Sequence, residues 1–540
     1  ASLGAFAIGE MAEGVAVMIF YGVGEMLQDA AVAKSRGNIE KLMDLRADRA
    51  NVRRKGQIVA VAPETVEVGE VIVVRPGEKV ALDGVLESGT GFLDTRALTG
   101  ESAPRRVLAG DEVLSGSISL DGVLELQVSR PFGESTVSRI LELVRHAAEK
   151  KSPTEKFITR FARVYTPAVV LLALLAAIIP PLAGFGTWQS WIYRALTFLI
   201  VSCPCALVLS IPLSFFGGIG GAARRGILVK GGNDLELLAR IGTVAFDKTG
   251  TLTRGVFKVV AINPAPGVTA HDLLELAALA ESQSNHPIAS SVLAAYGQRV
   301  GEAPPVREIA GLGIEAASSK GVIAAGNAAL MRKFGIEVAD DAGSAVHVAC
   351  AGRYCGRLLI ADELKPGVRE AVEALRQTGV GRIAMLTGDN PAAAALAAEA
   401  AGIKLVRAGL LPQDKIIELE RLMATEAPGC KTAFVGDGIN DAPVLARADL
   451  GIAMGGIGSD AAIEAADVVL MTDDPGKIPE AITVARKTGR IVRENIALAL
   501  GLKGAVLVLA FFGFASAWFA IFADVGVALL AVANALRALR

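Results

Sequence analysis

The chain has 540 residues, more than a single hydrophobic core usually accommodates, so several domains are expected. Its formal net charge of −2 argues against a nucleic-acid or other polyanionic partner. A hydrophobic content of 52% and a mean hydropathy of +0.47 are high for a soluble protein and indicate membrane spans. Five cysteines in this length do not make a disulfide framework, which favours a reducing compartment for the soluble parts.

Residues 1–34 are the first candidate for a transmembrane helix. Glu10, Glu13 and Glu25 interrupt this apolar stretch, so an amphipathic surface helix is the alternative. Carboxylates inside a membrane are costly and usually functional, which favours the spanning interpretation. The chain opens with Ala1 inside an apolar stretch and has no initiator Met, so we expect further residues ahead of it in the full reading frame.

Residues 35–150 are expected to form a β-rich domain. Short β-branched runs between residues 57 and 128, such as Glu67-Val-Gly-Glu-Val-Ile-Val-Val74, are separated by Gly and Pro turns. The loop Leu98-Thr-Gly-Glu-Ser102 places a carboxylate, Glu101, in this domain. Thr-Gly-Glu also occurs widely in ordinary turns, so these three residues alone do not assign a function to the loop.

A transmembrane helical hairpin is predicted within residues 151–234. The stretches 164–193 and 195–223 contain no charged residue, and a bilayer requires only about 20 apolar residues in a helix. In Ser202-Cys-Pro-Cys205 the proline removes a backbone hydrogen bond and loosens the second helix between two cysteines. Buried cysteines are usually small hydrophobes, but thiolates at such an opening favour Cu(I), Zn²⁺, Cd²⁺ or Pb²⁺.

Residues 235–486 alternate apolar strands with Ala-rich helical segments, which predicts a parallel α/β sheet. About a hundred residues with their own strands and helices separate the first strand from the others. We therefore expect an inserted domain over residues 256–361, between the two sheet-forming segments 235–255 and 362–486. Within the insertion, Cys350 and Cys355 are expected to pack in a strand pair.

Acidic, Gly-flanked motifs follow three of the predicted strands: Asp247-Lys-Thr-Gly-Thr251, Met385-Leu-Thr-Gly-Asp389 and Val435-Gly-Asp-Gly-Ile-Asn-Asp441. The carboxyl ends of parallel strands lie at one edge of a sheet, so these motifs should converge. Such a cluster suits phosphoryl transfer, because Mg²⁺ prefers carboxylate ligands and the phosphate needs donors. Lys415, in Pro412-Gln-Asp-Lys415, can supply a neutralising cation.

A second transmembrane hairpin is predicted for residues 487–540, with spans at 496–522 and 525–536. Only Lys503 and Asp524 interrupt it, and we expect these two charges to pair because an isolated charge in a membrane is costly. Arg and Lys residues flank both hairpins on what would be one side, so the soluble domains are expected to be cytosolic.

The three strand-end motifs resemble the phosphorylation domain of P-type ATPases in sequence, order and separation. The resemblance implies a multidomain α/β protein with transmembrane helices: a haloacid-dehalogenase-like phosphorylation domain, an inserted α+β nucleotide-binding domain, a β-rich actuator domain and a helical membrane domain. It covers nearly the whole chain. The family pattern has eight membrane helices, of which about five are visible here.

The resemblance also implies roles for individual residues. Asp247 would be the nucleophile that forms an aspartyl-phosphate, and Glu101 would position the water that hydrolyses it. Mg²⁺ would be held by Asp247, the Thr249 carbonyl and Asp437. The residues around the phosphate, with Asp441 as support, would be Thr251, Thr387, Lys415 and Asn440.

A further resemblance, to the adenosine site of heavy-metal-transporting members, implies that the inserted domain binds ATP. The residues that would contact the nucleotide are Glu281, His286, Gly311, Gly313 and Asn327, with Gly326 nearby. A His next to Pro is otherwise unremarkable, and the glycines could simply form a turn.

The segments Asn495-Ile-Ala-Leu-Ala-Leu-Gly-Leu-Lys503 and Ala523-Asp-Val-Gly526 resemble the last two helices of the zinc-, cadmium- and lead-exporting subgroup. Asp524 adds a hard oxygen ligand to Cys203 and Cys205, which a divalent ion uses better than Cu(I) does. Lys503 would act as a built-in counterion that helps to expel the metal, and Glu13 matches a family carboxylate on the release path.

The expected function is therefore ATP-driven export of Zn²⁺, Cd²⁺ or Pb²⁺ through a membrane, most simply the bacterial inner membrane with the soluble domains cytoplasmic. The expected partners are lipid and the transported ion, with no nucleic acid and no obligate protein partner. A Cu(I) exporter is the nearest alternative. A potassium-pump subunit, a soluble aspartate-nucleophile phosphatase and a non-catalytic metal-binding membrane protein are weaker ones.

Overall fold

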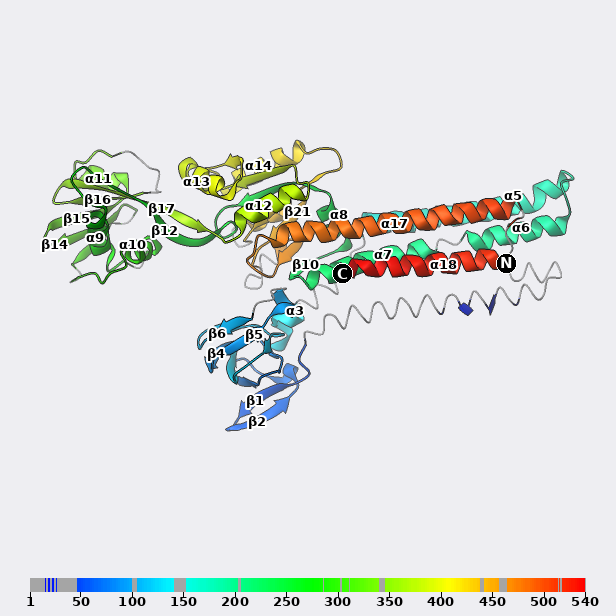
Figure 1. The fold of residues 1–540 in the computed structure, drawn as a ribbon, viewed down its shortest axis with the longest axis horizontal. Helices are drawn as coiled ribbons and strands as arrows, with labels where there is room; N and C mark the ends of the chain where they lie inside the picture. The colour runs from blue at the N-terminus through cyan, green and yellow to red at the C-terminus, as the bar shows by residue number, and fades with distance from the viewer. Residues whose placement is uncertain are drawn as a thin grey trace. The chain divides into compact units, whose positions relative to one another are not determined.

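The structure is a computed structural model in which the chain separates into two units (Figure 1). One unit comprises Ala1–Arg240, Asp467–Thr472 and Glu480–Arg540, and the other comprises Ile241–Ala466 and Asp473–Pro479. The described residues, besides isolated positions between 15 and 26, are 46–99, 104–139, 152–202, 205–284, 286–301, 304–309, 311–338, 345–437, 441–455, 464–512, 514 and 517–539.

The β-rich domain predicted in the first unit is confirmed. An antiparallel sheet has the order β2-β1-β3-β9-β4-β7, and a smaller one has the order β6-β5-β8. These strands are β1 (Ala50–Arg54), β2 (Gln57–Val61), β3 (Val71–Val74), β4 (Gly84–Ser88), β5 (Gly91–Asp94), β6 (Arg105–Val107), β7 (Glu112–Val113), β8 (Ile118–Ser119) and β9 (Leu124–Val128). Short turns η1 (Pro63–Thr65), α3 (Arg96–Thr99) and η2 (Phe132–Glu134) connect them.

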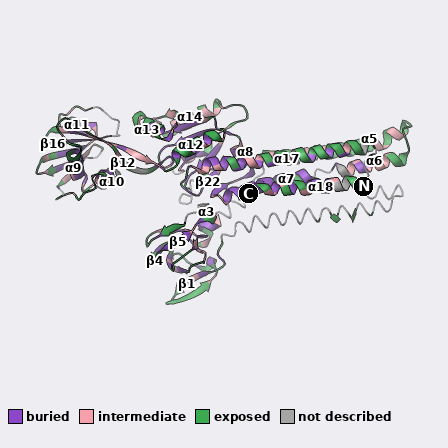
Figure 2. Cartoon of the chain, viewed as in Figure 1, coloured by how far each residue is buried: buried purple, intermediate pink, exposed green. Residues whose placement is uncertain are grey.

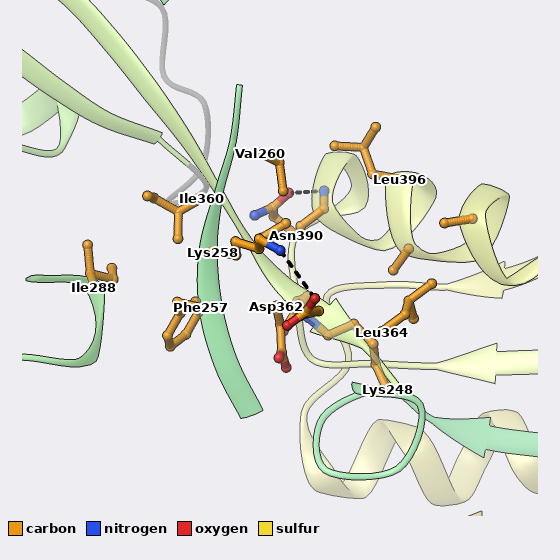
Figure 3. A pocket seen from close by; sticks show the side chains of 16 residues that line it. Lys248, Phe257, Lys258, Val260, Ile288, Ile360, Asp362, Leu364, Asn390 and Leu396 are labelled. Carbon is orange, nitrogen blue, oxygen red and sulfur yellow. Dashed lines mark hydrogen bonds and ion pairs between the residues drawn. The ribbon is translucent and has the colours of Figure 1, made fainter. Parts of the chain in front are cut away.

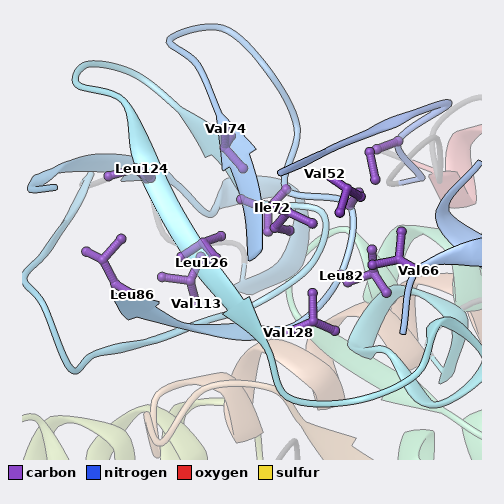
Figure 4. Packing of buried hydrophobic residues seen from close by; sticks show 14 of the residues in the cluster. Val52, Val66, Ile72, Val74, Leu82, Leu86, Val113, Leu124, Leu126 and Val128 are labelled. Carbon is purple, nitrogen blue, oxygen red and sulfur yellow. The ribbon is translucent and has the colours of Figure 1, made fainter. Parts of the chain in front are cut away.

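The core of this domain follows from the period-2 alternation of its strands. In β9 the side chains of Leu124, Leu126 and Val128 are buried, and those between them are less so. They pack with residues of the other strands, among them Val52 and Ile72 (Figure 4). The core therefore lies on one face of the sheet.

One buried carboxylate ties this β-rich core to the segment that follows it. Asp83, 1% exposed, accepts hydrogen bonds from the Ser115 N–H (2.7 Å) and from the N–H and hydroxyl of Thr136 (2.8 and 2.9 Å). Three donors compensate the charge for its loss of water.

The predicted hairpin over 151–234 is formed by α5 (Pro153–Leu182), α6 (Trp188–Val201) and α7 (Cys205–Ala223). α5 begins with a capping box in which Ser152 and Glu155 exchange hydrogen bonds. Only 12% of its most apolar 18-residue stretch is buried. Most residues of this stretch are therefore exposed, as a lipid-facing helix requires (Figure 2). By length and composition, α5 and residues 206–223 could span a membrane.

The second hairpin is formed by α17 (Lys477–Phe511) and α18 (Ala517–Ala535), followed by η4 (Leu536–Leu539). The expected boundary between its spans, at residues 522–525, was wrong. α17 ends at Phe511 and Asp524 lies within α18. A charged residue in an apolar run usually indicates the end of a span, but Asp524 can lie inside a helix because it pairs with Lys503. Elsewhere in this unit, α8 (Gly232–Ala239) follows β10 (Ile227–Val229), which pairs with β22 (Val468–Leu470).

The parallel sheet predicted for the second unit is confirmed, with its strands in the order β21-β20-β11-β18-β19. They are β11 (Ile241–Asp247), β18 (Arg382–Leu386), β19 (Leu405–Arg407), β20 (Lys431–Gly436) and β21 (Leu450–Ala453). The accompanying helices are α12 (Val368–Gln377), α13 (Pro391–Ala401), α14 (Pro412–Ala424) and α15 (Ala442–Arg447). Buried residues such as Phe434 and Leu386 form its core.

The inserted domain is confirmed as an antiparallel sheet with the order β12-β17-β16-β15-β14-β13. Its strands are β12 (Thr253–Pro264), β13 (Val306–Ile309), β14 (Gly313–Ser318), β15 (Gly321–Gly326), β16 (Ala345–Cys350) and β17 (Arg353–Leu364), and its helices are α9 (Ala270–Glu281), α10 (Pro287–Tyr296) and α11 (Ala328–Lys333). Cys350 and Cys355 lie on adjacent strands and pack in one core cluster, as predicted. The paired strands β12 and β17 lead out of and back to the parallel sheet.

Asp83 provides a test of this description of the β-rich domain. The Asp83→Ala change leaves buried donors without an acceptor, which costs about 1–3 kcal/mol for each unsatisfied group. We expect faster hydrogen–deuterium exchange in peptides from residues 46–139, measured by mass spectrometry on the whole chain. Glu87→Ala, at an exposed position of β4, is the control, and equal protection in both variants would contradict the assignment.

Candidate functional site

The three strand-end motifs meet at one edge of the parallel sheet. Asp247 pairs in register with Leu386, and Phe246 with Val435, so the residues after these strands are neighbours. Thr387 follows β18 directly and Asp437 follows β20 directly. The predicted convergence is therefore confirmed, while the chemical roles of these residues stay predictions.

Lys415 joins two of the carboxylates. Its ammonium, on the first turn of α14, lies 2.6 Å from Asp247 Oδ1 and 2.9 Å from Asp441 Oδ1. Asp247 and Asp441 are 5% and 2% exposed, so neither carboxylate can rely on water for its charge. A shared cation is what allows both to be buried together.

The electrostatics of the site follow from this burial. Burial, and then the charge of Asp441, raises the pKa of Asp247 to about 6, against the opposing charge of Lys415. Burial likewise raises the pKa of Asp441. Burial alone would lower the pKa of Lys415, but the charge of Asp247 and the hydrogen bonds to both carboxylates raise it. At neutral pH Asp247 is therefore mostly ionised, with the Lys415 cation beside it.

The site also has polar atoms that lack a partner. Thr251 Oγ1 and Asp437 Oδ1 are buried without a hydrogen bond among the described residues. A Cβ atom added at Gly250 would lie 2.9 Å from Asp437 Oδ2, so the loop after Asp247 lies against Asp437. Gly250 has φ of 74°, which favours glycine in this close approach. These free oxygens beside Asp247 fit a Mg²⁺ ion and a phosphate group.

Two further residues of the motifs are placed as follows. Thr387 is buried, and its hydroxyl accepts a hydrogen bond from the Asp389 N–H at 3.1 Å. Thr249 lies in the turn between Asp247 and Gly250. Asn440 lies outside the described residues, as do Glu101, Glu13 and Cys203, and of Cys205 only its place as the first residue of α7 is described.

Sequence reasoning missed two lysines of this site. Lys248 pairs with Asp389. Lys365, 5% exposed, donates to the Gly250 carbonyl and lies 2.6 Å from Asp473 Oδ1. The partners of Lys365 are more than a hundred residues away in sequence, so no local pattern could identify them. Lys248, directly after Asp247, could have been suspected from its position.

In the inserted domain, Glu281 ends α9 and is 6% exposed. Burial raises the pKa of Glu281 to about 7, opposed by a hydrogen bond from Ser284 and aided by the charge of Glu308. Such a carboxyl group can donate as well as accept a hydrogen bond near neutral pH. His286 is exposed and caps α10, with its Nδ1 accepting from the Ile288 N–H at 3.2 Å.

The remaining predicted nucleotide residues have structural reasons for their identity. A Cβ at Gly313, where φ is 140°, would lie 2.2 Å from the Ala325 carbonyl oxygen, so this strand pair requires glycine. Asn327 caps α11 through the Leu330 N–H (3.1 Å) and donates to the Gly311 carbonyl (2.9 Å). Asn327 thus holds the Gly311 turn in place. Glu308, on the strand β13 before that turn, lies near enough to Glu281 of α9 for its charge to raise the pKa of Glu281.

A cavity of about 610 Å³ lies between the inserted domain and the parallel sheet. Its lining runs from Ile288, two residues after His286, across Phe257 on β12 to Leu396 on α13 and the Lys248–Asp389 pair (Figure 3). The lining combines apolar side chains, such as Phe257 and Leu396, with charged ones, such as Lys248 and Lys258. A molecule with an aromatic base and a polyphosphate needs both kinds of contact.

Among the predicted transport residues, Lys503 and Asp524 are brought together. Lys503 Nζ, on α17, lies 2.5 Å from Asp524 Oδ1, on α18, and the side chains are 8% and 7% exposed. The predicted pairing of these two charges is confirmed.

Comparisons with known proteins agree with this geometry. Residues 241–449 match the haloacid dehalogenase-like hydrolase family, and residues 44–145 match the P-type ATPase actuator domain. A cadmium, zinc and cobalt-transporting ATPase of Bacillus subtilis is 53% identical over 100% of this chain and 78% of its own length. A zinc-transporting ATPase of Synechocystis is 52% identical over 99% of this chain and 75% of its own.

Solved structures give the same result. The crystal structure of a zinc-transporting PIB-type ATPase in an E2.Pi state is 39% identical, with a TM-score of 0.64. It covers 100% of this chain, and this chain covers 89% of it. The likeness therefore extends over the described domains as well as the motifs.

The titration of Asp247 yields a test. Below about pH 6 its carboxylate is protonated, so phosphorylation of Asp247 by labelled ATP should slow as the pH falls through that value. Lys415→Met removes the cation that opposes protonation, so the pKa of Asp247 rises and the profile should move to higher pH. Lys431→Met, which breaks only the 2.7 Å pair with Asp449, is the control. A profile unchanged by Lys415→Met would refute this account.

Proposed function

Because the chain belongs to the heavy-metal-transporting P-type ATPases, we propose that it hydrolyses ATP through an aspartyl-phosphate at Asp247 and exports a soft divalent ion. The ions are Zn²⁺ and also Cd²⁺ and Pb²⁺. The observation that supports the catalytic part most directly is the buried Asp247 carboxylate at a strand end, 2.6 Å from the Lys415 ammonium. The names of the relatives, which transport cadmium, zinc and cobalt, support the cargo.

In the first chemical step, an Asp247 oxygen attacks the γ-phosphorus of ATP. The new P–O bond forms as the bond to the β,γ-bridging oxygen breaks, and ADP leaves with that electron pair. Lys415 stabilises the negative charge that gathers on the transferred group, and Asp441 holds Lys415 in position. The Thr251 hydroxyl, Thr387 and Asn440 surround the phosphoryl oxygens.

The Mg²⁺ ion that this chemistry needs would be held by Asp247, Asp437 and the Thr249 carbonyl. When bound, it supplies positive charge to the phosphoryl oxygens. The free Asp437 Oδ1 and the close approach of Asp437 to the Gly250 loop support this placement. Lys365 fixes that loop through the Gly250 carbonyl.

ATP would occupy the cavity between the inserted domain and the sheet. Its adenosine would lie near Glu281 and His286, and its phosphates would reach toward Lys248. Gly311, Gly313 and Asn327 do not line that cavity, and they would contribute to nucleotide binding through the turn that Asn327 holds in place. In the second chemical step a water attacks the phosphorus of the aspartyl-phosphate. Glu101 takes its proton, and phosphate leaves as the Asp247 carboxylate is restored.

The cargo would bind between α7, α17 and α18, at Cys203, Cys205 and Asp524. A divalent ion competes with Lys503 for the Asp524 carboxylate, and the returning ammonium then displaces the ion toward Glu13. A monovalent Cu⁺ gains less from a hard carboxylate, which disfavours the Cu(I)-exporter alternative. A soluble phosphatase would have no use for a buried Lys–Asp pair on helices such as α17 and α18.

The transporter is a membrane protein, and its location would be the bacterial inner membrane with the soluble domains in the cytoplasm. Lys and Arg residues at the ends of the hairpins, such as Arg224 and Arg225 after α7, support this orientation. Lipid and the transported ion would be its partners, without an obligate protein subunit.

The cargo is tested by ATP hydrolysis of the purified chain in vesicles with Zn²⁺, Cd²⁺, Pb²⁺ or Cu⁺. We expect stimulation by the divalent ions, and loss of both phosphorylation and hydrolysis in Asp247→Asn. Stimulation by Cu⁺ alone would refute the proposed cargo. Hydrolysis that persists in Asp247→Asn would refute the proposed intermediate.

The role of Lys503 has its own test. Lys503→Ala should still accept phosphate at Asp247 in the presence of Zn²⁺, but it should release the metal at least tenfold more slowly, because nothing displaces the ion from Asp524. Zn²⁺ efflux and phosphoenzyme are measured together in vesicles. Lys487→Ala, on α17 but away from Asp524, is the control. Normal Zn²⁺ transport by Lys503→Ala would contradict the proposed role of Lys503.

A further inference from the structure

A fully buried amide lies within α17, where a polar side chain needs partners on neighbouring helices. Asn495 is 0% exposed. Its Nδ2 lies 3.1 Å from the Ala531 carbonyl oxygen of α18 and 3.5 Å from Ser214 Oγ of α7, and its Oδ1 accepts from Asn534 Nδ2 of α18 at 2.9 Å. One side chain thus connects three helices, and we call Ser214, Asn495 and Asn534 the polar clasp.

The clasp is anchored at both ends. On one side, the Ser214 hydroxyl donates to the Ser210 carbonyl at 2.7 Å, one turn earlier in α7. On the other, Asn534 Oδ1 accepts from Arg537 at 2.6 Å, and Asn534 Nδ2 donates to Glu494 at 3.2 Å. The hydrogen bonds therefore run without interruption from the exposed Arg537 to the interior of α7.

A glycine of α7 also lies directly against a side chain of α17 beside the clasp. A Cβ added at Gly218 of α7 would lie 2.4 Å from Thr488 Oγ1 of α17. Gly218 and Thr488 are four and seven residues from the clasp residues of their helices, that is one and two turns. The contacts of Gly218 with Thr488 and of Ser214 with Asn495 thus fix how α7 lies along α17.

The clasp and the Lys503–Asp524 pair both tie α17 to α18, at two levels, and the clasp also includes α7. The eight residues from Asn495 to Lys503 span about 12 Å of α17, at 1.5 Å per residue. The Lys503–Asp524 pair is ionic, and in the proposed cycle it must open when the ion reaches Asp524. The hydrogen bonds among Ser214, Asn495 and Asn534 join neutral amides and a hydroxyl, so a metal cation has no charged side chain to displace among these three residues.

We propose that Asn495 is a positioning residue for the transport site, which holds α7, α17 and α18 in register while the Lys503–Asp524 pair opens for the ion. It is not a ligand of the ion, because its amide nitrogen and oxygen are already engaged by Ala531, Ser214 and Asn534. This inference rests on the proposed function, since it assigns Asn495 to a site for a divalent metal.

The test compares two ways of phosphorylating Asp247 in the full chain. Phosphorylation by ATP at varied free Zn²⁺ reports the transport site, whereas phosphorylation by inorganic phosphate, with Mg²⁺ but without Zn²⁺, does not require that site to be occupied and reports the folding of the phosphorylation domain. In Asn495→Leu, which is similar in size but cannot hydrogen bond, we expect the half-saturating Zn²⁺ concentration to rise about tenfold. Phosphorylation by inorganic phosphate should stay within twofold of wild type.

Two further variants complete the experiment. Ser214→Ala removes only the longest bond of the clasp, so it should raise the half-saturating Zn²⁺ concentration two- to threefold even if Asn495→Leu fails to fold. Thr197→Val is the matched control, because this buried hydroxyl bonds only within its own helix, to the Tyr193 carbonyl at 3.0 Å. It should behave as wild type.

The outcomes separate the inference from the proposed function. If wild type requires Zn²⁺ but neither Asn495→Leu nor Ser214→Ala shifts the half-saturating concentration, the inference is overturned and the function stands. Equal loss of both kinds of phosphorylation in Asn495→Leu, with no shift in Ser214→Ala, would assign a general structural role and also overturn it. A wild-type chain indifferent to every metal would refute the proposed function, and the inference with it.

Discussion

The ammonium of Lys415 between Asp247 and Asp441 determines what the rest of the second unit can do. Two carboxylates are buried where parallel strands end, and without a shared cation at least one would be protonated or repelled. With it, Asp247 can remain ionised in a site largely closed to water. α14 has to present Lys415 at that point, and the order β20-β11-β18 has to bring the strand ends together. The arrangement of the parallel sheet thus allows the charge of Lys415 to compensate the charges of Asp247 and Asp441.

The membrane helices show the same principle with a different outcome. Lys503 and Asp524 are as deeply buried as the phosphorylation site, but they form a simple pair rather than a triad. Asp247 and Asp441 share one lysine, so the cation stays when one carboxylate is modified. Among the described residues Asp524 pairs with Lys503, so in the proposed cycle an incoming ion would have to displace that lysine. Two carboxylates around one lysine keep that lysine in place during a reaction at one of them. A simple ion pair suits a site where another cation would replace the lysine.

Much of the fold and of the phosphorylation site could be predicted from the sequence, because strands such as β11 are short apolar runs and the motif after each one is local. The turn between α17 and α18 was misplaced because a charge in an apolar run looks like an end, and its partner 21 residues away was not used to place it. Lys365 was missed, and the contacts of Asn495 were not predicted, for a related reason: their partners lie on other elements, and nothing beside them in the sequence indicates the contact. Gly313 was predicted for the nucleotide, but its φ of 140° and the adjacent Ala325 carbonyl already require glycine there.

The paired strands β12 and β17 have a consequence for how this chain folds. Thr253 and Leu364 lie opposite each other in the pair, and the Lys365 N–H donates to the Leu252 carbonyl at 2.9 Å, so the inserted domain leaves and re-enters the sheet at adjacent points. Closing a loop of more than a hundred residues costs considerable chain entropy. An inserted domain that folds first closes this loop itself, and β11 and β18 then pair as though only the crossover through α12 separated them. Folding of the phosphorylation sheet should therefore wait for its insertion, although no strand of the insertion belongs to that sheet.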